Sequence, residues 1–426
     1  MMTIKSVGKA ALTSLLEAQV KRLRKRNNFT VVAVAGSVGK TSTKLAIAEV
    51  LAAHQTVRWQ RGNYNDRVTV PLVFFGCNEP SIFNVFAWLK IIVTNEQILR
   101  RPYNYDVVVV ELGTDGPGQM EQFAYVQPDI TVLTAITPEH MEYFGDLDAV
   151  AREELAVTSY SKTLLCNIDD MAPEYLVGVT HSGYGFTSNA DYRIELIDSA
   201  AKWKQAIIVQ TPQGVVRAQI NLAGKPGAKA AAAAVSIATM LGVPTSAVTK
   251  SVENLQPAAG RMRILQGLQN ATIIDDTYNS SPVAVMAALD VLYAAKAPQR
   301  IAVLGSMNEM GKASQTMHES VGAYCDPKYV DCIVTIGKMA NDWLATAAQA
   351  SGCLVHMTDS PYQAAEFLKT IIKPGAVILA KGSQNAVFAE EAIRPLLNDP
   401  ADAQNLVRQS PYWQQIKRAQ FSDYRL

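Results

Sequence analysis

The segment Val31–Thr43, VVAVAGSVGKTST, contains the residue types of a phosphate-binding loop. Its first four residues are apolar and mostly β-branched, which predicts a buried strand, and a helix is expected to begin at the Lys-Thr-Ser after the glycines. Such a loop points backbone N–H groups and a helix N-terminus at an anion. The residues expected to hold a nucleotide here are Gly36, Ser37, Gly39, Lys40, Thr41 and Ser42.

Two side chains of this loop are expected to have separate tasks. Lys40 supplies a positive charge for the β- and γ-phosphates, and the hydroxyl of Thr41 can ligate magnesium. The strict loop pattern has glycine where this chain has Val34, so the loop is a variant of the form G-S-V-G-K-T. Strand, glycines, Lys-Thr and helix still occur in the required order. This order favours a phosphate site over a glycine-rich turn without function.

Polar residues also follow two other expected strands. Glu111 comes directly after the run VVVV, and His140 lies just after the expected strand Ile130–Thr134. Open α/β sheets bind ligands at the carboxyl ends of their strands, and carboxylate oxygens suit Mg²⁺. We therefore predict that Glu111 holds Mg²⁺ opposite Thr41 and that His140 contacts metal or phosphate. A helix cap or salt bridge is the alternative for Glu111, and a structural role is the alternative for His140.

Two short polar segments are candidate substrate sites. The segment GNYN contains Asn63 and Asn65, and an ordinary turn is the alternative explanation for it. Lys381 and Ser383 follow the expected strand Ala376–Ala380 and could bind an anionic substrate group, although a helix that starts at a glycine would also explain them.

A cluster of polar and aromatic residues follows a strand in the second half of the chain. Asp276, Tyr278 and Asn279 lie at the end of the expected strand Thr272–Asp276. A carboxylate, an aromatic ring and an amide at a strand end suit the recognition of a ribose and a base. Arg261 lies at a predicted domain junction, from which it could reach phosphates.

Apolar strand-like runs alternate with longer helical stretches, which predicts an α/β fold with mostly parallel sheets. Short alternating segments between Tyr184 and Leu222 predict an antiparallel ribbon at a sheet edge. We divide the chain into a helical extension at 1–28, a central P-loop domain at 29–258 and a second, Rossmann-like α/β domain at 259–426. The other expected strands are Val31–Ala35, Val107–Leu112, Thr163–Asn167, Arg300–Leu304 and Cys332–Ile336.

Composition limits the class of protein. The chain has 426 residues, 49% of them hydrophobic, and a formal charge of +1, so it has an ample core and nucleic acid is not expected as its main partner. The basic run Lys21–Arg26 predicts the charged, solvated end of an amphipathic helix rather than a membrane anchor. The apolar stretch Ile82–Val93 is too short to span a bilayer and predicts a buried or partner-facing helix, without stable membrane insertion.

The cysteines and the N-terminus indicate the compartment. The five cysteines are scattered without a C-x-x-C pair, so neither a disulfide framework nor a zinc site is expected. The first ten residues lack the apolar core and cleavage site of a signal peptide. We therefore predict a cytoplasmic protein.

Taken together, these motifs resemble the Mur ligase family, the ATP-dependent amide-bond ligases of peptidoglycan synthesis. The matching segments lie in order between about Thr30 and Leu396, and such ordered agreement is more specific than any one motif. They are GSVGKTST, GNYNDRVTVPL, VVVVELGTDGPGQM, PDITVLTAITPEHMEYFGDLDAVARE, GRMRIL, IIDDTYNSSPVAVMAALDVL, IAVLGSMNEMGKASQTMHESVG and ILAKGSQNAVFAEE.

The resemblance implies a central P-loop ATPase domain and a C-terminal Rossmann-like domain that brings an incoming amine, with ATP and Mg²⁺ as cofactors. ATP phosphorylates a substrate carboxylate, the amine attacks the acyl phosphate, and a tetrahedral intermediate collapses to the amide. The pattern is most like the branch that adds D-alanyl-D-alanine. The resemblance therefore implies this dipeptide, and a peptidoglycan precursor such as UDP-N-acetylmuramoyl-tripeptide, as substrates.

The resemblance also assigns residue roles. Phosphates would be contacted by Lys40 and Arg261, magnesium ions would be served by Thr41, Glu111 and His140, the nucleotide would be lined by Asp276, Tyr278 and Asn279, and the acceptor would be faced by Lys381 and Ser383.

Three features depart from the family pattern. Only about one helix precedes the P-loop, where the family normally has a separate domain that grips the UDP group. Glu154, with Glu153 beside it, stands where these ligases usually present a lysine that becomes carbamylated and holds the second magnesium. We predict Glu154 as a metal ligand, although its stem is about 3–4 Å shorter. Pro226–Ala230 replaces a His-Asn-x-x-Asn stretch that helps to bind adenine.

These departures leave two alternatives to the leading hypothesis. The protein could be a related ligase with another substrate, which the missing UDP-binding domain favours. It could also be a non-catalytic nucleotide-binding partner, which Glu154 and the lost amides favour. Retention of Lys40, Thr41, Glu111 and His140 favours an active ligase.

Overall fold

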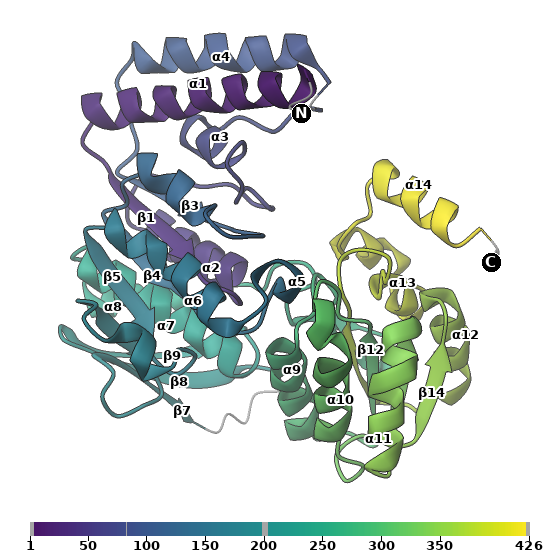
Figure 1. The fold of residues 1–426 in the computed structure, drawn as a ribbon. Helices are drawn as coiled ribbons and strands as arrows, with labels where there is room; N and C mark the ends of the chain where they lie inside the picture. Colours follow the sequence, from purple (N-terminus) through teal and green to yellow (C-terminus); the bar gives the residue numbers. More distant parts are fainter. Residues whose placement is uncertain (1–3, 82, 198–202, 423–426) are drawn as a thin grey trace.

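The computed structural model describes residues 4–81, 83–197 and 203–422, and these residues form two lobes, each built on its own sheet (Figure 1). In the first lobe the strands lie in the order β2-β3-β1-β4-β5-β6-β7-β8-β9. They are β1 (Thr30–Ala35), β2 (Val57–Arg58), β3 (Val107–Glu111), β4 (Ile130–Leu133), β5 (Thr163–Asn167), β6 (Ser182–Gly185), β7 (Tyr192–Ile197), β8 (Gln205–Thr211) and β9 (Gly214–Ile220).

The strands from β2 to β7 are parallel, whereas β7, β8 and β9 pair antiparallel at one edge. Strand β1 shows why its sequence is a continuous apolar run. Val32 and Val34 face one core cluster and Val31, Ala33 and Ala35 face the other, because successive side chains of a strand point to opposite faces. Both faces of the sheet are covered, as is usual for parallel sheets.

Helices cover both faces of this sheet and extend beyond it. Helix α7 contains a run of five alanines, all buried, and these small side chains allow it to pack closely on α2. The helices of the first lobe are α1 (Ile4–Arg26), α2 (Lys40–Ala52), α3 (Val70–Phe75), α4 (Val85–Leu99), α5 (Met141–Phe144), α6 (Leu147–Leu155), α7 (Gly224–Met240) and α8 (Thr245–Glu253).

The second lobe has the strand order β10-β11-β15-β12-β13-β14, in which only β10 is antiparallel to its neighbour. These strands are β10 (Arg263–Gln266), β11 (Thr272–Asp276), β12 (Arg300–Gly305), β13 (Cys332–Ile336), β14 (Val355–Thr358) and β15 (Val377–Lys381). Its helices are α9 (Pro282–Ala294), α10 (Ser314–Tyr324), α11 (Thr346–Ala350), α12 (Pro361–Ile371), α13 (Glu390–Ile393) and α14 (Pro411–Gln420).

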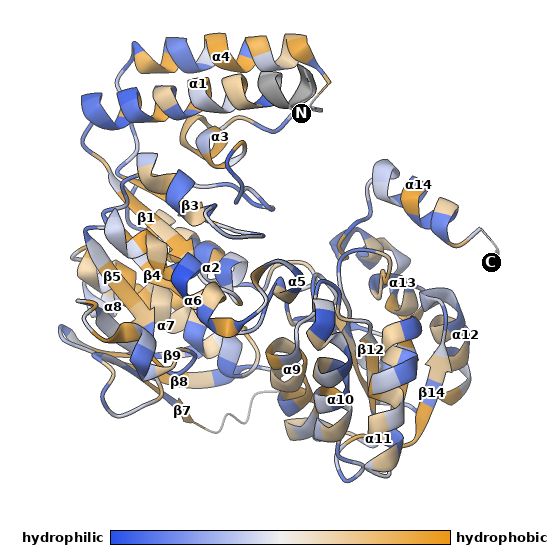
Figure 2. Ribbon diagram, viewed as in Figure 1, coloured by the Kyte–Doolittle hydropathy of each residue, from blue (hydrophilic) through white to orange (hydrophobic). Residues whose placement is uncertain are grey.

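Helices α1, α3 and α4 form a layer of their own above the first sheet (Figure 1), held by an apolar cluster that includes Leu16, Leu72 and Trp88. Figure 2 shows hydrophobic residues concentrated in both sheets and also along α4, whereas the C-terminal end of α1 is hydrophilic. Within the part of the chain that the structure describes, no helix has the length and hydropathy needed to cross a membrane.

The predicted α/β class with mostly parallel sheets is confirmed, and the antiparallel ribbon lies at the sheet edge as expected. Every predicted strand is present with bounds shifted by at most one residue. The strands that the sequence pattern missed are β2, β6, β10 and β14, each of at most four residues and therefore too short for a clear period. The helix expected over Ile82–Val93 begins at Val85, where Asn84 caps it, and Ile82 lies outside the described residues.

Candidate active site

Strand order places the site. The chain leaves β1, forms β2 and β3 on one side of it, and then crosses to β4 on the other side. Ligands of open α/β sheets bind at such a reversal, outside the carboxyl ends of the strands. The phosphate-binding loop follows β1, Glu111 ends β3, and His140 follows β4. Register pairs Glu111 with Val34, which brings this carboxylate beside the loop.

The loop between β1 and α2 depends on its two glycines. Gly36 and Gly39 have φ angles of 119° and 89°, which residues with a side chain rarely adopt. A Cβ atom on Gly36 would also lie 2.5 Å from the hydroxyl of Thr134. Ser37 fixes the loop to the end of β4, because its backbone N–H donates to Ala135 O at 2.9 Å and its Oγ accepts from the N–H of Thr137 at 2.9 Å.

Glu111 is buried under α2 and contacts three side chains. The hydroxyl of Thr41 and the amide of Asn65 each donate to its Oε1 at 3.2 Å, and the ammonium of Lys44 lies 3.0 Å from its Oε2. The side chains of Glu111 and Lys44 are each 2% exposed. The sequence analysis missed Lys44, whose only signal is its position one helical turn after Lys40. Thr41, Asn65 and Glu111 are thus brought together.

Lys40 lies against backbone and carboxylate groups at the loop. Its ammonium donates to Gly36 O and, at 3.2 Å, to Ser37 O, and it lies 3.5 Å from Glu139 Oε1. Burial acts to lower the pKa of Lys40, but the negative charges of Glu139, Glu154 and Glu111 outweigh burial and raise it. The ammonium therefore stays charged at the place where phosphates would bind.

The adjacent residues Glu153 and Glu154 on α6 have different environments. Glu153 accepts hydrogen bonds from the N–H groups of Gly118 and Met120, both at 2.6 Å, and from the hydroxyl of Thr114 at 3.0 Å. The carboxylate of Glu153 thereby holds the loop that follows β3. Glu154 instead points at the phosphate-binding loop and accepts from the N–H of Gly36 at 2.8 Å.

Glu139, which is partly buried, and Glu154, which is fully buried, form a carboxyl pair next to Lys40. Burial raises the pKa of both groups, that of Glu139 well above its usual range, and each also feels the other's charge or hydrogen bond. Glu154 is fully buried, and Glu139 Oε1 lies 3.5 Å from the ammonium of Lys40. The sequence analysis did not single out Glu139. Its signal was its place directly before His140, in the segment that follows β4.

This donor set fits a magnesium ion only together with phosphate oxygens. Among the residues that the structure describes, no group of three or more His, Cys, Asp or Glu side chains is arranged to hold a metal. Mg²⁺, however, is commonly bound by one or two carboxylates plus substrate phosphates and water. The unpartnered Oε1 of Glu154 and the carboxylate of Glu139, beside a loop built for phosphate, meet that requirement.

His140 joins the two lobes. It adopts a left-handed conformation, with φ of 47°, at the start of α5. Its Nδ1 lies 2.8 Å from a carboxylate oxygen of Glu309 in the second lobe, and its Nε2 lies 3.4 Å from Asp115. The contact with His140 lowers the pKa of Glu309. Glu142 N–H also donates to Glu309 O at 3.3 Å, so this contact involves backbone as well.

In the second lobe, Asp276 and Lys381 occupy the ends of the neighbouring strands β11 and β15 and form a buried ion pair of 2.5 Å. Lys381 also donates to Asn279 O at 3.0 Å. Ser383 accepts from the backbone N–H of Asn308 at 2.9 Å. The predicted acceptor residue Lys381 is therefore held by the predicted nucleotide residue Asp276, and the two belong to one site.

Arg261 lies across the ring of Tyr278, with its guanidinium carbon 4.1 Å from the ring centroid. The loop beneath them is held by Asp275, which accepts from the N–H of Gly260 at 3.0 Å and from the hydroxyl of Thr277 at 2.6 Å. Burial raises the pKa of Asp275 to about 6. The junction between the lobes is thereby fixed to the end of β11.

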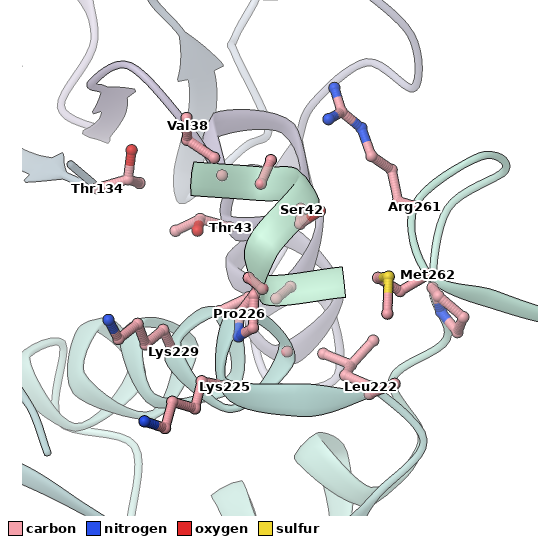
Figure 3. Close-up of a pocket in the computed structure, with 18 of the residues that line it drawn as sticks. Val38, Ser42, Thr43, Thr134, Leu222, Lys225, Pro226, Lys229, Arg261 and Met262 are labelled. Atoms are coloured by element: carbon pink, nitrogen blue, oxygen red, sulfur yellow. The ribbon is translucent and has the colours of Figure 1, made fainter. Parts of the chain in front are cut away.

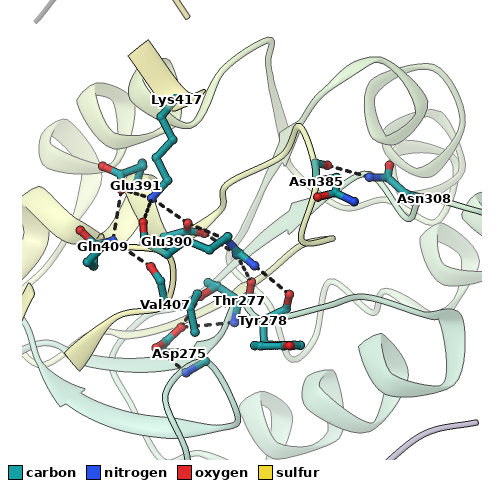
Figure 4. Close-up of polar contacts among 12 residues, drawn as sticks. Asp275, Thr277, Tyr278, Asn308, Asn385, Glu390, Glu391, Val407, Gln409 and Lys417 are labelled. Atoms are coloured by element: carbon teal, nitrogen blue, oxygen red, sulfur yellow. Dashed lines mark hydrogen bonds and ion pairs between the residues drawn. The ribbon is translucent and has the colours of Figure 1, made fainter. Parts of the chain in front are cut away.

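The C-terminal segment also supports this loop, and Figure 4 draws Glu390, Glu391 and Lys417 of this segment together with Thr277 and Tyr278. Arg408 donates to the backbone oxygens of Thr277, at 2.5 Å, and Tyr278, at 2.9 Å, and its guanidinium also binds Glu390. Lys417 of α14 is fully buried and lies 2.9 Å from Glu390 and 2.6 Å from Glu391. The charges of this network balance, and it ties α14 to the loop that carries Tyr278.

Three cavities meet at the phosphate-binding loop. The first, of about 260 Å³, lies between α2, α7 and the junction of the lobes (Figure 3). The second, of about 150 Å³, lies between the lobes and shares Gly39, Arg261 and Lys381 with the first. The third, of about 520 Å³, extends toward α1 and shares Lys40, Asn65, Asp115 and His140 with the second.

The predicted residues distribute over these cavities. Gly39, Ser42, Arg261 and Asp276 line the first cavity. The second is lined by Ser37, Lys40, Thr41, Asn63, Asn65, Glu111, His140, Tyr278, Asn279 and Ser383. Glu154 lines none of the three and reaches the site from below, through the N–H of Gly36. In the first cavity, Pro226 and Gly227 form the wall, and Lys229 lies 2.7 Å from Asp170.

Comparisons with known proteins agree with this arrangement. The pattern of the Mur ligase middle domain matches residues 34–238, and that of the Mur ligase glutamate ligase domain matches residues 260–384. The chain is 25% identical to a UDP-N-acetylmuramoyl-tripeptide–D-alanyl-D-alanine ligase of Bacillus subtilis, with 92% of this chain and 80% of the relative covered. Identity to the Escherichia coli enzyme of the same name is 27%, with 86% and 76% covered.

A solved structure of similar fold is the MurF ligase of Thermotoga maritima in complex with ADP. Its TM-score is 0.73 at 22% identity, and 92% of this chain and 84% of that chain are covered. The two domain patterns together span the loop, Glu111, His140 and Lys381. With both lobes matched in order, the chain belongs to the Mur ligase family.

Proposed function

We propose that this protein is an ATP-dependent ligase that activates a carboxylate of a peptidoglycan precursor and joins it to D-alanyl-D-alanine or a similar amine. The observation that carries the proposal is the meeting of three cavities at Lys40 and its loop. One cavity suits a nucleotide, and the other two can deliver a donor and an acceptor to the same phosphate position. A protein that only binds nucleotide has no need of the other two.

Each part of the site would have a separate role in the reaction. The loop amides and Lys40 would hold the β- and γ-phosphates and offset the charge on the transferring group. An oxygen of the donor carboxylate, entering through the third cavity, attacks the γ-phosphorus, and ADP leaves. The neutral amine nitrogen, entering through the second cavity, attacks the acyl carbon. The C–N bond forms, the acyl C–O bond breaks, and phosphate leaves with the proton that the nitrogen loses. Holding both partners in line is the main contribution of the two lobes.

Magnesium would bind at two places. Thr41 and Glu111 would hold one ion with phosphate oxygens, and Glu139 and Glu154 would hold a second with phosphate oxygens, with His140 beside them. The ions supply positive charge that neutralises the phosphoryl oxygens. Glu154 here offers a carboxylate without modification by CO₂, and Glu139 adds a second carboxylate that compensates for its shorter stem. Lys44, now paired with Glu111, would remain as the buried counter-charge of that carboxylate.

The nucleotide would lie with its phosphates on the loop and its base in the first cavity. Arg261 would contact phosphates, while Tyr278 and Asn279 would line the passage to the second cavity. Pro226 and Gly227 offer no side-chain amides, so base selectivity would depend on shape and on Asn167 and Asp170, which also line the cavity. We propose residues 29–258 and 259–426 as the two catalytic domains and the cytoplasm, where ATP is available, as the location.

The decisive experiment is a coupled assay of phosphate release from ATP. Release should require Mg²⁺, a carboxylate precursor and D-alanyl-D-alanine together, and mass spectrometry should show a product that is heavier by the dipeptide minus water. UDP-N-acetylmuramoyl-tripeptide and shorter peptide precursors should be compared as donors. Release without either substrate, or ATP binding without any release across the donor panel, would reject the proposal.

A further inference from the structure

The outward face of α4 is apolar, although no described residue of the first lobe covers it. Val85, Phe86, Leu89 and Val93 have exposed fractions of 63%, 86%, 52% and 56%. Most large hydrophobic side chains of the described residues are buried instead. An exposed apolar row on a soluble lobe usually marks a contact surface.

Helical spacing shows that the row is a face and not a packing defect. Trp88, Ile91, Asn95 and Leu99 are buried, and their spacing of three and four residues places them on one side of α4, against α1 and α3. Phe86, Leu89 and Val93 repeat with the same spacing on the opposite side. The helix therefore has two apolar sides, and only one of them is used by this fold.

Basic residues share the outward side. Lys90 lies four residues after Phe86 and beside Leu89, on the same side of α4. Arg100 and Arg101 directly follow the C-terminal end of α4, and all three basic residues are exposed. The C-terminal end of the parallel helix α1 is also basic, but its exposed Lys21 and Lys25 line a separate hollow beside Asp129 and Lys162. Figure 2 shows the hydrophilic C-terminal end of α1 beside α4.

The layer formed by α1 and α4 is positively charged, whereas the other residues of the chain carry a net negative charge. Helices α1 and α4, with the two arginines that follow α4, contain ten Lys or Arg and two Glu residues, a formal charge of +8. The whole chain carries +1, so all other residues together carry −7. Positive charge is thus concentrated in the layer that carries the exposed apolar row of α4.

We propose that the α1–α4 layer docks peripherally on an anionic phospholipid surface. Phe86, Leu89 and Val93 would enter the headgroup boundary, and Lys90, Arg100 and Arg101 would contact the lipid phosphates. An apolar row flanked by Lys and Arg is the pattern of helices that lie in a membrane interface, and anionic lipids attract such segments. The proposal is independent of the ligase reaction.

Charge argues against the other occupants. A second copy of this layer would bring two surfaces of +8 face to face, which like-charge repulsion disfavours. Nucleic acid would use the basic residues but would leave the row of Phe86, Leu89 and Val93 unexplained. An anionic bilayer is complementary to both features.

Vesicle flotation of the full chain tests the proposal. Vesicles of phosphatidylglycerol and phosphatidylcholine should carry the protein, and pure phosphatidylcholine should carry little. The double variant Phe86→Ser/Leu89→Ser should bind at least tenfold more weakly, because the apolar contact is lost. Arg100→Gln/Arg101→Gln should lose about 30-fold and show a weaker salt dependence. Leu354→Ser, an equally exposed apolar residue in the second lobe, is the matched control and should bind normally.

ADP binding and circular dichroism serve to show that the variants are folded. With folded variants, each outcome either supports or overturns docking on the lipid surface. Equal binding to both vesicle types, or normal binding by the Phe86/Leu89 variant, would overturn the proposal. Absence of binding to either vesicle type would overturn it as well. Self-association in analytical ultracentrifugation that disappears in the Phe86/Leu89 variant would assign the face to a second copy instead.

Discussion

Lys40 lies between the backbone oxygens of its own loop and the carboxyl group of Glu139, so its charge has partners even without a nucleotide. When phosphates arrive, the ammonium can exchange these contacts for phosphate oxygens over a short distance. The raised pKa means that no proton needs to be gained for this exchange.

Replacement of this charge gives the first prediction. Lys40→Ala should lower turnover by a factor of about 10² to 10³, because the charge on the transferring phosphoryl group is no longer offset. The melting temperature should stay close to that of the wild type. The coupled phosphate assay measures the effect, and Lys250→Ala, an exposed lysine on α8, is the control. Near-normal activity of Lys40→Ala would reject the site.

Glu153 and Glu154 offer a matched pair for the second prediction. Glu153→Gln should lower stability by about 2–4 kcal/mol, because an amide NH₂ would face the N–H donors of Gly118 or Met120. Glu154→Gln can still accept from Gly36 and should leave the melting temperature nearly unchanged, but it should weaken Mn²⁺ binding in the presence of ADP at least tenfold. Thermal unfolding and Mn²⁺ titration by electron paramagnetic resonance separate the two roles. Equal effects of both variants on Mn²⁺ binding would contradict the assignment.

At the scale of elements, the C-terminal segment supports a loop that lies far from it in sequence. Arg408 carries three partners at once, namely Glu390 and the backbone oxygens of Thr277 and Tyr278. Only a planar guanidinium can serve them together. Because Arg261 rests on the ring of Tyr278, the position of α14 is coupled to the nucleotide cavities.

The third prediction follows from this coupling. Arg408→Lys should raise the KM for ATP about tenfold and leave kcat within about twofold, because a point charge cannot hold both carbonyl groups and Glu390. Arg22→Lys alters an Arg–Glu pair in the first lobe, between α1 and α4, whose arginine is 52% exposed, and should change neither constant. An unchanged KM in Arg408→Lys would show that the loop holds its shape alone.

At the scale of the whole molecule, the contact of His140 with Glu309 joins the two lobes beside the second cavity, which both residues line. Helix α5 and the turn at Gly311 pack closely, since a Cβ atom on Gly311 would lie 2.8 Å from Glu142. When the two lobes are packed together, Glu309 lies against Nδ1 of His140 and fixes the orientation of the imidazole ring.

The fourth prediction concerns this contact. Glu309→Ala should lower kcat/KM about 10- to 100-fold, the usual cost of losing a group that orients a metal-binding histidine. Small-angle scattering should show a larger radius of gyration, because the lobes lose a contact. Glu319→Ala, in α10 of the same lobe, serves as the control. Unchanged activity and size in Glu309→Ala would place the catalytic arrangement of the lobes elsewhere.

The predicted fold class rested on local patterns, and these were sufficient. A strand that is buried on both faces must be a continuous apolar run, and a phosphate-binding loop needs glycines and a helix start within a few residues. For this reason the strand, loop and helix of Val31–Thr43 could be predicted from that segment alone. The strand-end rule also placed Glu111 and His140 near that loop, because parallel strands end at one edge of a sheet.

Other parts of the site depend on contacts between residues far apart in the chain, which no local pattern contains. Lys44 pairs with Glu111 across 67 positions, and Glu309 and Arg408 reach His140 and Tyr278 over still longer separations. From the sequence alone, a charged residue that binds substrate cannot be distinguished from one that pairs with another side chain. Burial and pairing distinguish these cases, and they exist only once the lobes are packed. The sequence thus determined the chemistry that is available, and tertiary structure decided which groups share it.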